Sequence, residues 1–448
     1  MHPEEPVMRT TTSPAATVTR PALRLSLPRR PLLLFCATGI VLAAIAQLIG
    51  AHILALGVGS VTFYPLIWGI LLGGAVSLQR VRPVPLTLQK AAPHLVEAGV
   101  FLLAARLSLT VGPNLGVLLH AGPAMLLQEV GHLLGTVLFS LPVAVLLRMG
   151  RPAVGACFSI DRESSFAMVS EKYGADSDEY RGVLGMYVFG TVFGALYVGL
   201  LASVLSSLHV FNPLALAMGS GVGSGSVMAA ASASIAAAHP ELGSQVLAVA
   251  TVSNLITSIL GGFVGMFIAL PLADRFYRLL TRRRSARGAA LPAPTAIPAE
   301  PVDETPQAAP ARWITLPVMA FAMMLSNILF HRGIDLTEVL GFAAMIAVVV
   351  VALAVKKLTR LPAIVGVAVL ATALTTPISP VADLLTRLVA PIDFLSLTVP
   401  VLVFAGLGIG KDMPVLRRVG WRIVPVGLVS FAATFVAAAA IAQFALHM

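Results

Sequence analysis

Residues 218–240 read MGSGVGSGSVMAAASASIAAAHP, a stretch with four glycines and five serines among its alanines and no acidic residue, lysine or arginine. A helix that faces lipid is instead rich in leucine, isoleucine, valine and phenylalanine. Irregular backbone is tolerated at membrane depth only where it is buried in protein or lines a cavity. The stretch therefore predicts a broken or re-entrant helical element within a membrane protein.

The rest of the chain has the composition of a polytopic membrane protein. Hydrophobic residues make up 57% of the 448 residues and charged residues only 11%, whereas a soluble domain has about 25% charged residues. Apolar runs of roughly 20 residues, each long enough to cross a bilayer core, begin with 32–54 and 58–78 and recur to the end of the chain. We predict an all-α fold with about 11–13 transmembrane segments, in which 153–172 and 213–238 are the two broken or re-entrant elements.

The cysteines and the positive charge exclude several classes of protein. Cys36 and Cys157 both lie in apolar runs, so they form neither a disulfide framework nor a metal site of recognised spacing. The net charge is +10, but the basic residues cluster beside apolar spans and not in a patch interleaved with aromatic residues. That arrangement is typical of cytoplasmic loops and argues against a nucleic-acid partner. Membrane lipid is the partner that the composition predicts.

Two polar stretches divide the chain into parts. Residues 1–30 contain five arginines and predict a disordered cytoplasmic tail. Residues 273–312 hold a group of arginines at 275–287 and continue as a Pro/Ala-rich sequence, which predicts an extended cytoplasmic linker. The remaining parts are a scaffold-type repeat at 31–148, a core at 149–272 and a second scaffold-type repeat at 313–448. The basic loops place the N-terminus in the cytoplasm and the C-terminus in the periplasm or outside the cell.

Two pairs of short segments indicate an internal repeat. The first pair is NLGVLLHAG at 114–122 and DMPVLRRVG at 412–420, at an offset of 298 residues. The second pair is YPLIWGILLGG at 64–74 and LPAIVGVAVLA at 361–371, at an offset of 297. Because 114–122 has no formal charge and its counterpart is basic, the two copies are predicted to run through the membrane in opposite directions. Inverted repeats of this kind are typical of secondary transporters.

A weaker repeat relates the two halves of the core. Residues 165–194 and residues 218–258 each combine a segment rich in small residues, a break and a full helix. Each half is therefore predicted to hold one of the two broken elements.

Two motifs resemble a known group of membrane proteins. The segment 403–428, VFAGLGIGKDMPVLRRVGWRIVPVGL, resembles the last helix pair of uncharacterised bacterial putative exporters, and GSGVGSGS at 219–226 resembles the glycine-rich hairpins of 2-hydroxycarboxylate and glutamate carriers. Over most of 31–448 the chain resembles the inverted-repeat, elevator-type secondary transporters, which include the sodium–glutamate, 2-hydroxycarboxylate and bile-acid symporters. The Gly-Gly-Xaa-Gly pattern of the hydroxycarboxylate carriers is absent.

The resemblance implies a function and a cellular location. It implies an ion-coupled secondary transporter that moves a small organic anion or an amino acid across the bacterial inner membrane by alternating access. Na⁺ or H⁺ is the implied coupling ion, and no other cofactor, metal or catalytic residue is expected. Because elevator-type transporters are often dimers, a homodimer is implied as well.

The candidate substrate site is the broken element at 213–238. Glycine allows a sharp turn and a close approach of a ligand to the backbone, and broken helix ends offer N–H groups to anions and carbonyl groups to cations. The alternative is close helix packing through small residues. The candidate substrate ligands are Gly221, Gly223, Ser224, Gly225 and Ser226, with Arg162 and Ser164 from the other broken element.

The candidate ion-coupling residues are the polar groups at membrane depth, since ionisable residues there are functional candidates by default. Glu129 and His132 lie three residues apart and share one helical face. A zinc protease of the membrane would need His-Glu-Xaa-Xaa-His, but position 128 is glutamine. The alternatives are an interfacial helix cap for the acidic cluster and a polar domain contact for Glu129. The full set is Asp161, Glu163, Asn254, Thr257, Glu129 and His132; Glu97 and Arg106 are assigned no role.

Two other functions stay open at this point. A holin-like or regulatory membrane protein would not need ion coupling. An intramembrane enzyme would need a catalytic pair on facing helices, and only Glu129 with His132 or Asp161 with Glu163 offers acid–base chemistry. A flux that saturates and shows counterflow distinguishes a carrier from a channel.

Overall fold

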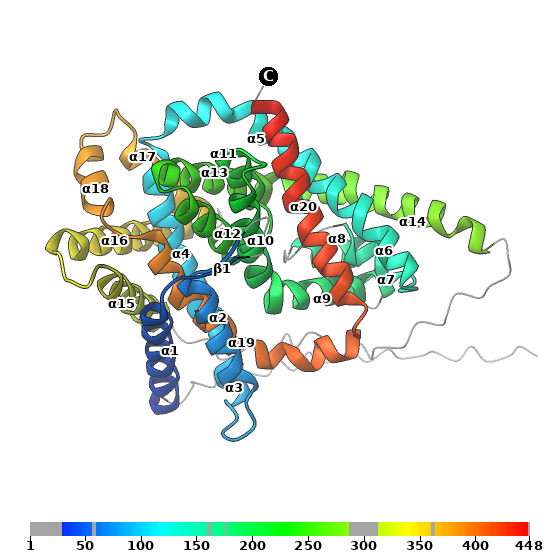
Figure 1. Ribbon diagram of the computed structural model, residues 1–448, viewed down its shortest axis with the longest axis horizontal. Helices are drawn as coiled ribbons and strands as arrows, with labels where there is room; N and C mark the ends of the chain where they lie inside the picture. Colours follow the sequence, from blue (N-terminus) through cyan, green and yellow to red (C-terminus); the bar gives the residue numbers. More distant parts are fainter. Residues whose placement is uncertain are drawn as a thin grey trace, which may run out of the picture.

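The structure is a computed structural model that describes residues 29–55, 60–158, 160, 164–174, 177–285, 312–359 and 363–446 (Figure 1). Its regular structure within these residues is helical apart from one short β-hairpin. Eight of the described helices are long and apolar enough to cross a membrane, and three shorter apolar helices accompany them. The all-α, polytopic membrane fold is therefore confirmed, whereas the predicted number of crossings stays a prediction.

The chain order of the elements follows the apolar runs of the sequence. The elements before the glycine-rich stretch are α1 (Arg29–Ile49), β1 (His52–Ala55), β2 (Ser60–Phe63), α2 (Pro65–Leu78), α3 (Leu86–Gln89), α4 (Ala92–Val111), α5 (Leu115–Gly135), η1 (Thr136–Ser140), α6 (Leu141–Leu146), α7 (Pro152–Ala156), α8 (Ser164–Tyr173), α9 (Asp178–Phe189), η2 (Gly190–Gly194) and α10 (Ala195–Leu208). The later elements are α11 (Pro213–Ser220), α12 (Gly225–Ala238), η3 (Pro240–Leu242), α13 (Gly243–Val264), η4 (Gly265–Ala269), α14 (Leu270–Ser285), α15 (Arg312–His331), α16 (Leu336–Thr359), α17 (Ala363–Thr375), α18 (Ala382–Val389), α19 (Phe394–Val419) and α20 (Ile423–Leu446). The segments η1, η2 and η4 are π-helical turns within longer helices, a feature that is frequent at functional sites.

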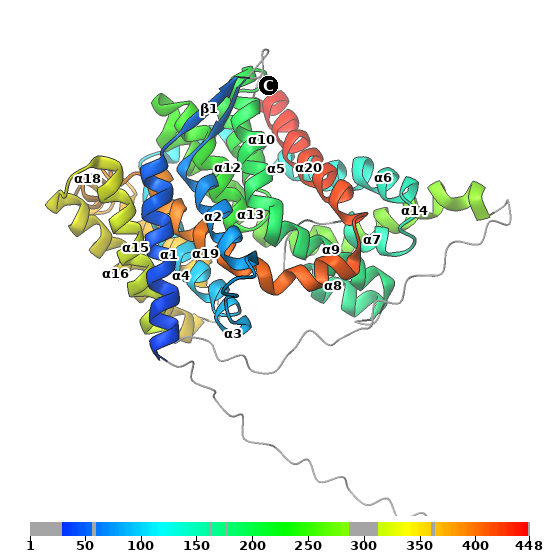
Figure 2. The same ribbon diagram turned by 60° about the horizontal axis from the view of Figure 1, so that its bottom comes forward.

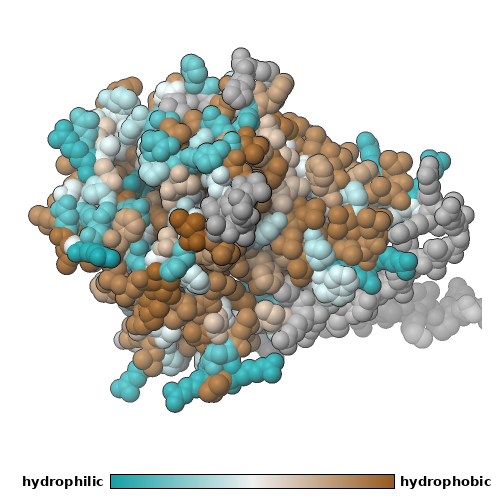
Figure 3. All heavy atoms as spheres, in the orientation of Figure 1, coloured by the Kyte–Doolittle hydropathy of each residue, from teal (hydrophilic) through white to brown (hydrophobic). Residues whose placement is uncertain are grey.

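The outer surface of the long helices is apolar. On α1, Leu33, Leu34 and Leu48 are more than half exposed, whereas Phe35 and Cys36 are buried. Figure 3 shows hydrophobic side chains over a broad area, with hydrophilic side chains gathered at the upper left and along the lower edge. A helix satisfies its own backbone N–H and C=O groups, so such a surface suits the hydrocarbon interior of a bilayer.

A β-hairpin interrupts the region of the first two predicted spans, 32–54 and 58–78. α1 ends at Ile49, and β1 pairs with β2 in an antiparallel register. Figure 2 shows the hairpin beside α10, where the N–H of Thr62 donates to Ser203 Oγ at 2.9 Å. The two span boundaries were wrong because apolar runs as short as HILA and SVTF do not distinguish a strand from a helix by periodicity.

The helix contacts support the predicted inverted repeat. α2 packs against α19 as α17 packs against α4, and α1 packs against α2 as α16 packs against α17. α5 and α20 pack against each other, and in Figure 1 α20 rises to the C-terminus while α5 descends toward α6. Between them the hydroxyl oxygens of Thr136 and Thr434, residues 298 apart, lie 2.6 Å from each other. This separation equals one predicted repeat offset, as expected for two equivalent residues that meet at the axis of an inverted repeat.

The core consists of two units built in the same way. In the first unit the short helices α7 and α8 precede a long helix of α9, η2 and α10, and in the second α11 and α12 precede α13, η4 and α14. α7 contacts α9 as α11 contacts α13, and α8 contacts α9 as α12 contacts α13. This arrangement matches the weaker repeat of the sequence. The last long helix continues to Ser285, so the predicted core boundary at 272 falls inside it.

Candidate functional site

The glycine-rich stretch folds into α11 and α12, which are separated by a break at residues 221–224. Gly223 has a φ of +86°, a left-handed conformation that glycine adopts without steric cost. A Cβ added at Gly221 would overlap the side chain of Ser253 on α13. The predicted broken element is thus a sharp turn held closely against α13.

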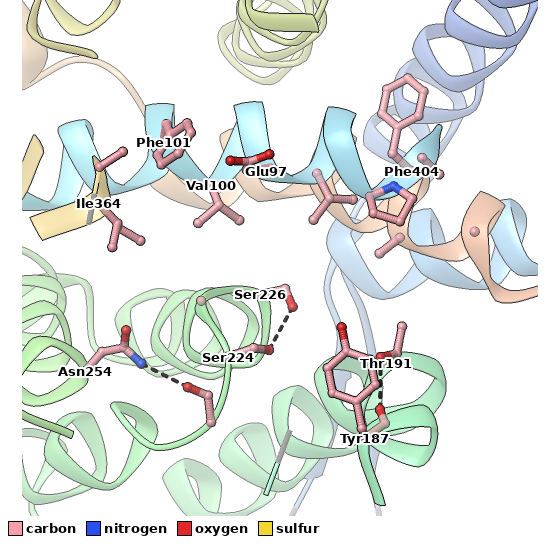
Figure 4. A pocket seen from close by; sticks show the side chains of 18 of the residues that line it. Glu97, Val100, Phe101, Tyr187, Thr191, Ser224, Ser226, Asn254, Ile364 and Phe404 are labelled. Carbon is pink, nitrogen blue, oxygen red and sulfur yellow. Dashed lines mark hydrogen bonds between the residues drawn. The ribbon is translucent and has the colours of Figure 1, made fainter. Parts of the chain in front are cut away.

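Two polar side chains of α13 bind the carbonyl groups of this break. Ser253 Oγ donates to the Met218 carbonyl at 2.7 Å. Asn254 Nδ2 donates to the carbonyls of Gly221 at 2.7 Å and Gly223 at 3.2 Å. Carbonyl groups at a helix end lack partners within the helix, and α13 satisfies them here. The side-chain nitrogen of Asn254 therefore points at the break between α11 and α12, and its side-chain oxygen points away from the break (Figure 4).

The N-terminus of α12 opens into a cavity of about 520 Å³ between α4 and the core, which we name the break cavity (Figure 4). Ser224 is the N-cap residue, but its own side chain makes no capping hydrogen bond to α12. The Ser224 hydroxyl instead lies 3.1 Å from that of Ser226. The N–H groups at a helix N-terminus carry a partial positive charge of about half a unit. Together with the two hydroxyls, they suit an anion.

Charged side chains from distant parts of the chain complete the lining of the break cavity. They are Glu97 from α4, Lys356 from α16 and Lys411 from α19. Lys411 Nζ also donates to the two carboxylate oxygens of Asp412 at 2.8 and 2.6 Å. The three residues were not predicted as site residues, because each lies more than 100 residues from the glycine-rich stretch. The polar lining also includes Tyr187, Thr191, Ser224, Ser226 and Asn254.

A second polar cluster joins α5 to α13. Thr257 Oγ1 donates to Glu129 Oε1, and Gln128 Nε2 donates to the same oxygen at 2.7 Å. All three residues are buried, and so is His132 one turn along α5. The structure therefore brings Glu129 and Thr257 together, with His132 buried one turn along α5, and none of the three lines the cavity that holds Asn254. In the part of the chain that the structure describes, no three His, Cys, Asp or Glu residues gather as a metal site would require.

The first broken element carries the other predicted site residues. Asp161, Arg162 and Glu163 lie outside the described residues, and Ser164 is the first residue of α8. Their roles in binding a substrate or an ion stay predictions.

Arg151, which precedes α7, holds the two core units together. Its Nε donates to Glu179 of α9 at 2.7 Å, and its Nη1 donates to Asp274 of α14 at 2.8 Å. The guanidinium lies over the ring of Tyr277, 5.4 Å from its centroid. Asp274 also pairs with Arg278 at 2.9 Å. Because α9 belongs to the first unit and α14 to the second, Arg151 links the two.

Replacing Arg151 by glutamine is expected to destabilise the protein by about 1–3 kcal/mol, since hydrogen bonds to charged groups contribute about that much and the Glu179 side chain is only 9% exposed. The melting temperature of the purified protein in detergent measures this effect. Arg278→Gln is the matched control, because Arg278 pairs with the same Asp274 but is 67% exposed, and exposed pairs contribute about 0–1 kcal/mol. Equal melting temperatures for the two variants would contradict the prediction.

Comparison with known proteins identifies a family. A family model described as "Protein of unknown function (DUF3100)" matches residues 44–279, which is more than half of the 448-residue chain. The matched part includes the broken elements of both core units. No curated protein and no solved structure matches the chain.

Proposed function

We propose that this chain, which belongs to the DUF3100 family, is a secondary transporter that carries a small organic anion across a membrane by alternating access. The observation that supports this most is the break between α11 and α12. The break presents the N-terminus of α12 and two hydroxyls to a cavity of about 520 Å³, a volume typical of small-molecule sites. Broken helices whose N-termini point at anionic substrates recur in secondary transporters.

The electrostatics of the break cavity also favour an anion. Among the described residues, Lys356, Lys411 and Glu97 line it, and Lys411 is paired with the carboxylate of Asp412. Because these side-chain charges balance, the N-terminus of α12 supplies the partial positive charge that suits an anion. The ammonium, hydroxyl and amide groups of the lining can bind an anion and release it again. We therefore propose a carrier and not an enzyme.

A second cavity at the other end of α12 supports alternating access. This cavity, which we name the Arg106 cavity, has a volume of about 920 Å³, and Ala233, Ala236 and Ala237 of α12 line it together with Arg106 of α4. α12 therefore reaches from one cavity to the other, and its small residues allow neighbouring helices to approach closely. A movement of the core against α4 would exchange access between the two cavities, as inverted repeats permit.

The proposal extends to coupling and location. The polar cluster of Glu129 and Thr257 between α5 and α13 supports coupling to a proton or to Na⁺. The lysines at the break cavity belong to basic segments that we predict to be cytoplasmic. We therefore place the break cavity toward the cytoplasm of a bacterial inner-membrane protein with a cytoplasmic N-terminus. The homodimer rests on the resemblance to elevator-type transporters.

Counterflow in proteoliposomes tests this function. Purified protein would be reconstituted and assayed with radiolabelled malate, citrate, pyruvate and glutamate. We expect saturable uptake of at least one anion that is accelerated by the same anion inside the vesicle. Ser224→Trp fills the break cavity and is expected to reduce this uptake to that of empty vesicles.

Leu126→Trp controls for the introduction of a tryptophan side chain, because Leu126 lies on α5 with 57% of its surface exposed. It should transport as the unaltered protein does. Uptake that is linear in concentration and lacks counterflow would favour a channel and contradict the proposal. Full transport by Ser224→Trp would show that the break cavity is not the substrate site.

A further inference from the structure

Arg106 is a buried arginine whose hydrogen bonding is incomplete. It is 7% exposed and lines the Arg106 cavity. Its Nε and Nη2 both donate to the carbonyl of Ile392, at 3.1 and 3.0 Å. Its Nη1 is buried and has no hydrogen-bond acceptor among the described residues. A buried donor without an acceptor is costly, so the guanidinium, which lines the cavity, would gain a hydrogen bond by turning Nη1 toward an acceptor there.

The carboxylate of Asp393 lines the same cavity and attracts Arg106, but it also makes hydrogen bonds of its own. Asp393 Oδ1 accepts the N–H of Ser396 at 2.6 Å, and the N–H of Asp393 donates to Asn327 Oδ1 at 2.9 Å. These bonds hold the segment that carries the Ile392 carbonyl against α15. Burial raises the pKa of the Asp393 carboxyl, and the hydrogen bond from Ser396 and the charges of His331 and Arg106 oppose this rise.

The rest of the lining is more basic than acidic. Arg332 is exposed and lines the cavity with His331, whose Nε2 lies 3.7 Å from Glu338 Oε1. Among the described residues, the guanidinium groups of Arg106 and Arg332 thus share the lining with the carboxylate of Asp393. The net charge favours an anionic ligand.

We propose that the Arg106 cavity is a second anion-binding site, in which Nη1 of Arg106 donates to one carboxylate group of a small organic acid. This site lies at the opposite end of α12 from the break cavity. It does not depend on the proposed transport, because it would bind its ligand whether or not the anion then moves. A carboxylate fits Nη1 because its oxygens accept charge-assisted hydrogen bonds.

A cysteine in the cavity wall can report on this site. Ser244 is exposed and lines the Arg106 cavity, while the native Cys36 and Cys157 are buried. The Ser244→Cys protein would be treated with an anionic and with a cationic methanethiosulfonate reagent of similar size. The readout is the ratio of the two reaction rates, with and without malonate at constant ionic strength.

Three results are expected. The anionic reagent reacts faster than the cationic one. Adding Arg106→Gln lowers the ratio of the anionic to the cationic reaction rate by about threefold, because the lost positive charge attracts one reagent and repels the other. Malonate slows both reactions, whereas neutral malonamide does not. Malonate protection disappears in Arg106→Gln but persists in the control Arg332→Gln, which removes an equal charge from the rim.

The same measurement would overturn the proposal in three ways. Absence of malonate protection with Arg106 intact would do so even if Arg106→Gln fails to fold. Protection by phosphate but not by malonate would overturn the assignment to a carboxylate. Protection that is lost in Ser224→Trp but kept in Arg106→Gln would assign the effect to the break cavity and leave Arg106 a packing residue.

Discussion

Replacing Gly155 or Gly182 by alanine is expected to destabilise the protein by about 3 kcal/mol or more, because the added Cβ would overlap main-chain atoms. α7 and α9 cross at these two glycines. A Cβ on Gly155 would overlap the carbonyl oxygen of Glu179, and a Cβ on Gly182 would overlap that of Pro152. Small residues allow membrane helices to approach this closely. Since each backbone presses on the other, no side chain can rotate away to relieve the overlap.

Gly116→Ala is the matched control for this prediction. Gly116 lies in α5, and nothing is within 4 Å of a Cβ added there. Alanine favours a helix over glycine by about 1 kcal/mol, so this variant should melt at the same temperature as the unaltered protein or above it. Melting would be followed by size-exclusion chromatography of heated samples. If Gly155→Ala melted together with Gly116→Ala, the tight crossing of α7 and α9 would be refuted.

The crossing also illustrates which contacts a sequence does not reveal. Gly155, Gly182 and Gly116 look alike in the sequence, because each is a glycine that is followed by apolar residues. What distinguishes the first two is a partner backbone that only folding brings near. The charged lining of the break cavity was missed for the same reason. A lysine beside a predicted cytoplasmic loop, such as Lys411, is explained by topology alone, and nothing local indicates that it lines the same cavity as Ser224.

The break between α11 and α12 could be predicted because its cause is local. Each glycine weakens a helix by about 1 kcal/mol relative to alanine, and four of them alternate with other residues in 219–225. Gly223 at the turn and Ser224 at the helix start follow from that pattern. Asn254 was also identified from the sequence, as a polar group in an apolar run, but its bonds to the loop carbonyls depend on the tertiary fold.

The repeat was predictable in outline but not in its contacts. The matched segments implied an offset of 297 or 298 residues, whereas Thr136 and Thr434 were in neither pair. Threonine in a membrane helix often bonds to its own backbone, as Thr136 does to the carbonyl of His132 at 2.9 Å. Only the packing of α5 on α20 shows that the two hydroxyls also meet.

Replacing Glu129 by glutamine is expected to abolish accumulation driven by a pH gradient while leaving counterflow intact. Glu129 is buried, and Thr257 and Gln128 both donate to its Oε1. A glutamine oxygen can accept the same two bonds, so the contact between α5 and α13 should survive. Glutamine does not titrate, however, so the cluster could no longer take up and release a proton as the core moves.

The size of this effect follows from the driving force. One pH unit supplies about 1.4 kcal/mol per proton, which sustains about tenfold accumulation of the substrate. In vesicles that hold such a gradient, the unaltered protein should approach this ratio, and Glu129→Gln should give equal concentrations inside and outside. Thr257→Val is the control, because it removes one donor and keeps the carboxylate, and it should still accumulate substrate.

The outcome decides whether Glu129 is a coupling group or only a contact between helices. Loss of accumulation with counterflow preserved would separate the proton step from substrate binding, which we propose for the break cavity at the N-terminus of α12. Loss of both would mean that the α5–α13 contact has failed and that Glu129 is structural. Accumulation that follows a Na⁺ gradient and is unchanged in Glu129→Gln would refute the proton role. The coupling ion would then bind outside the Glu129 cluster, and the carboxylates at 161 and 163 would be the next positions to replace.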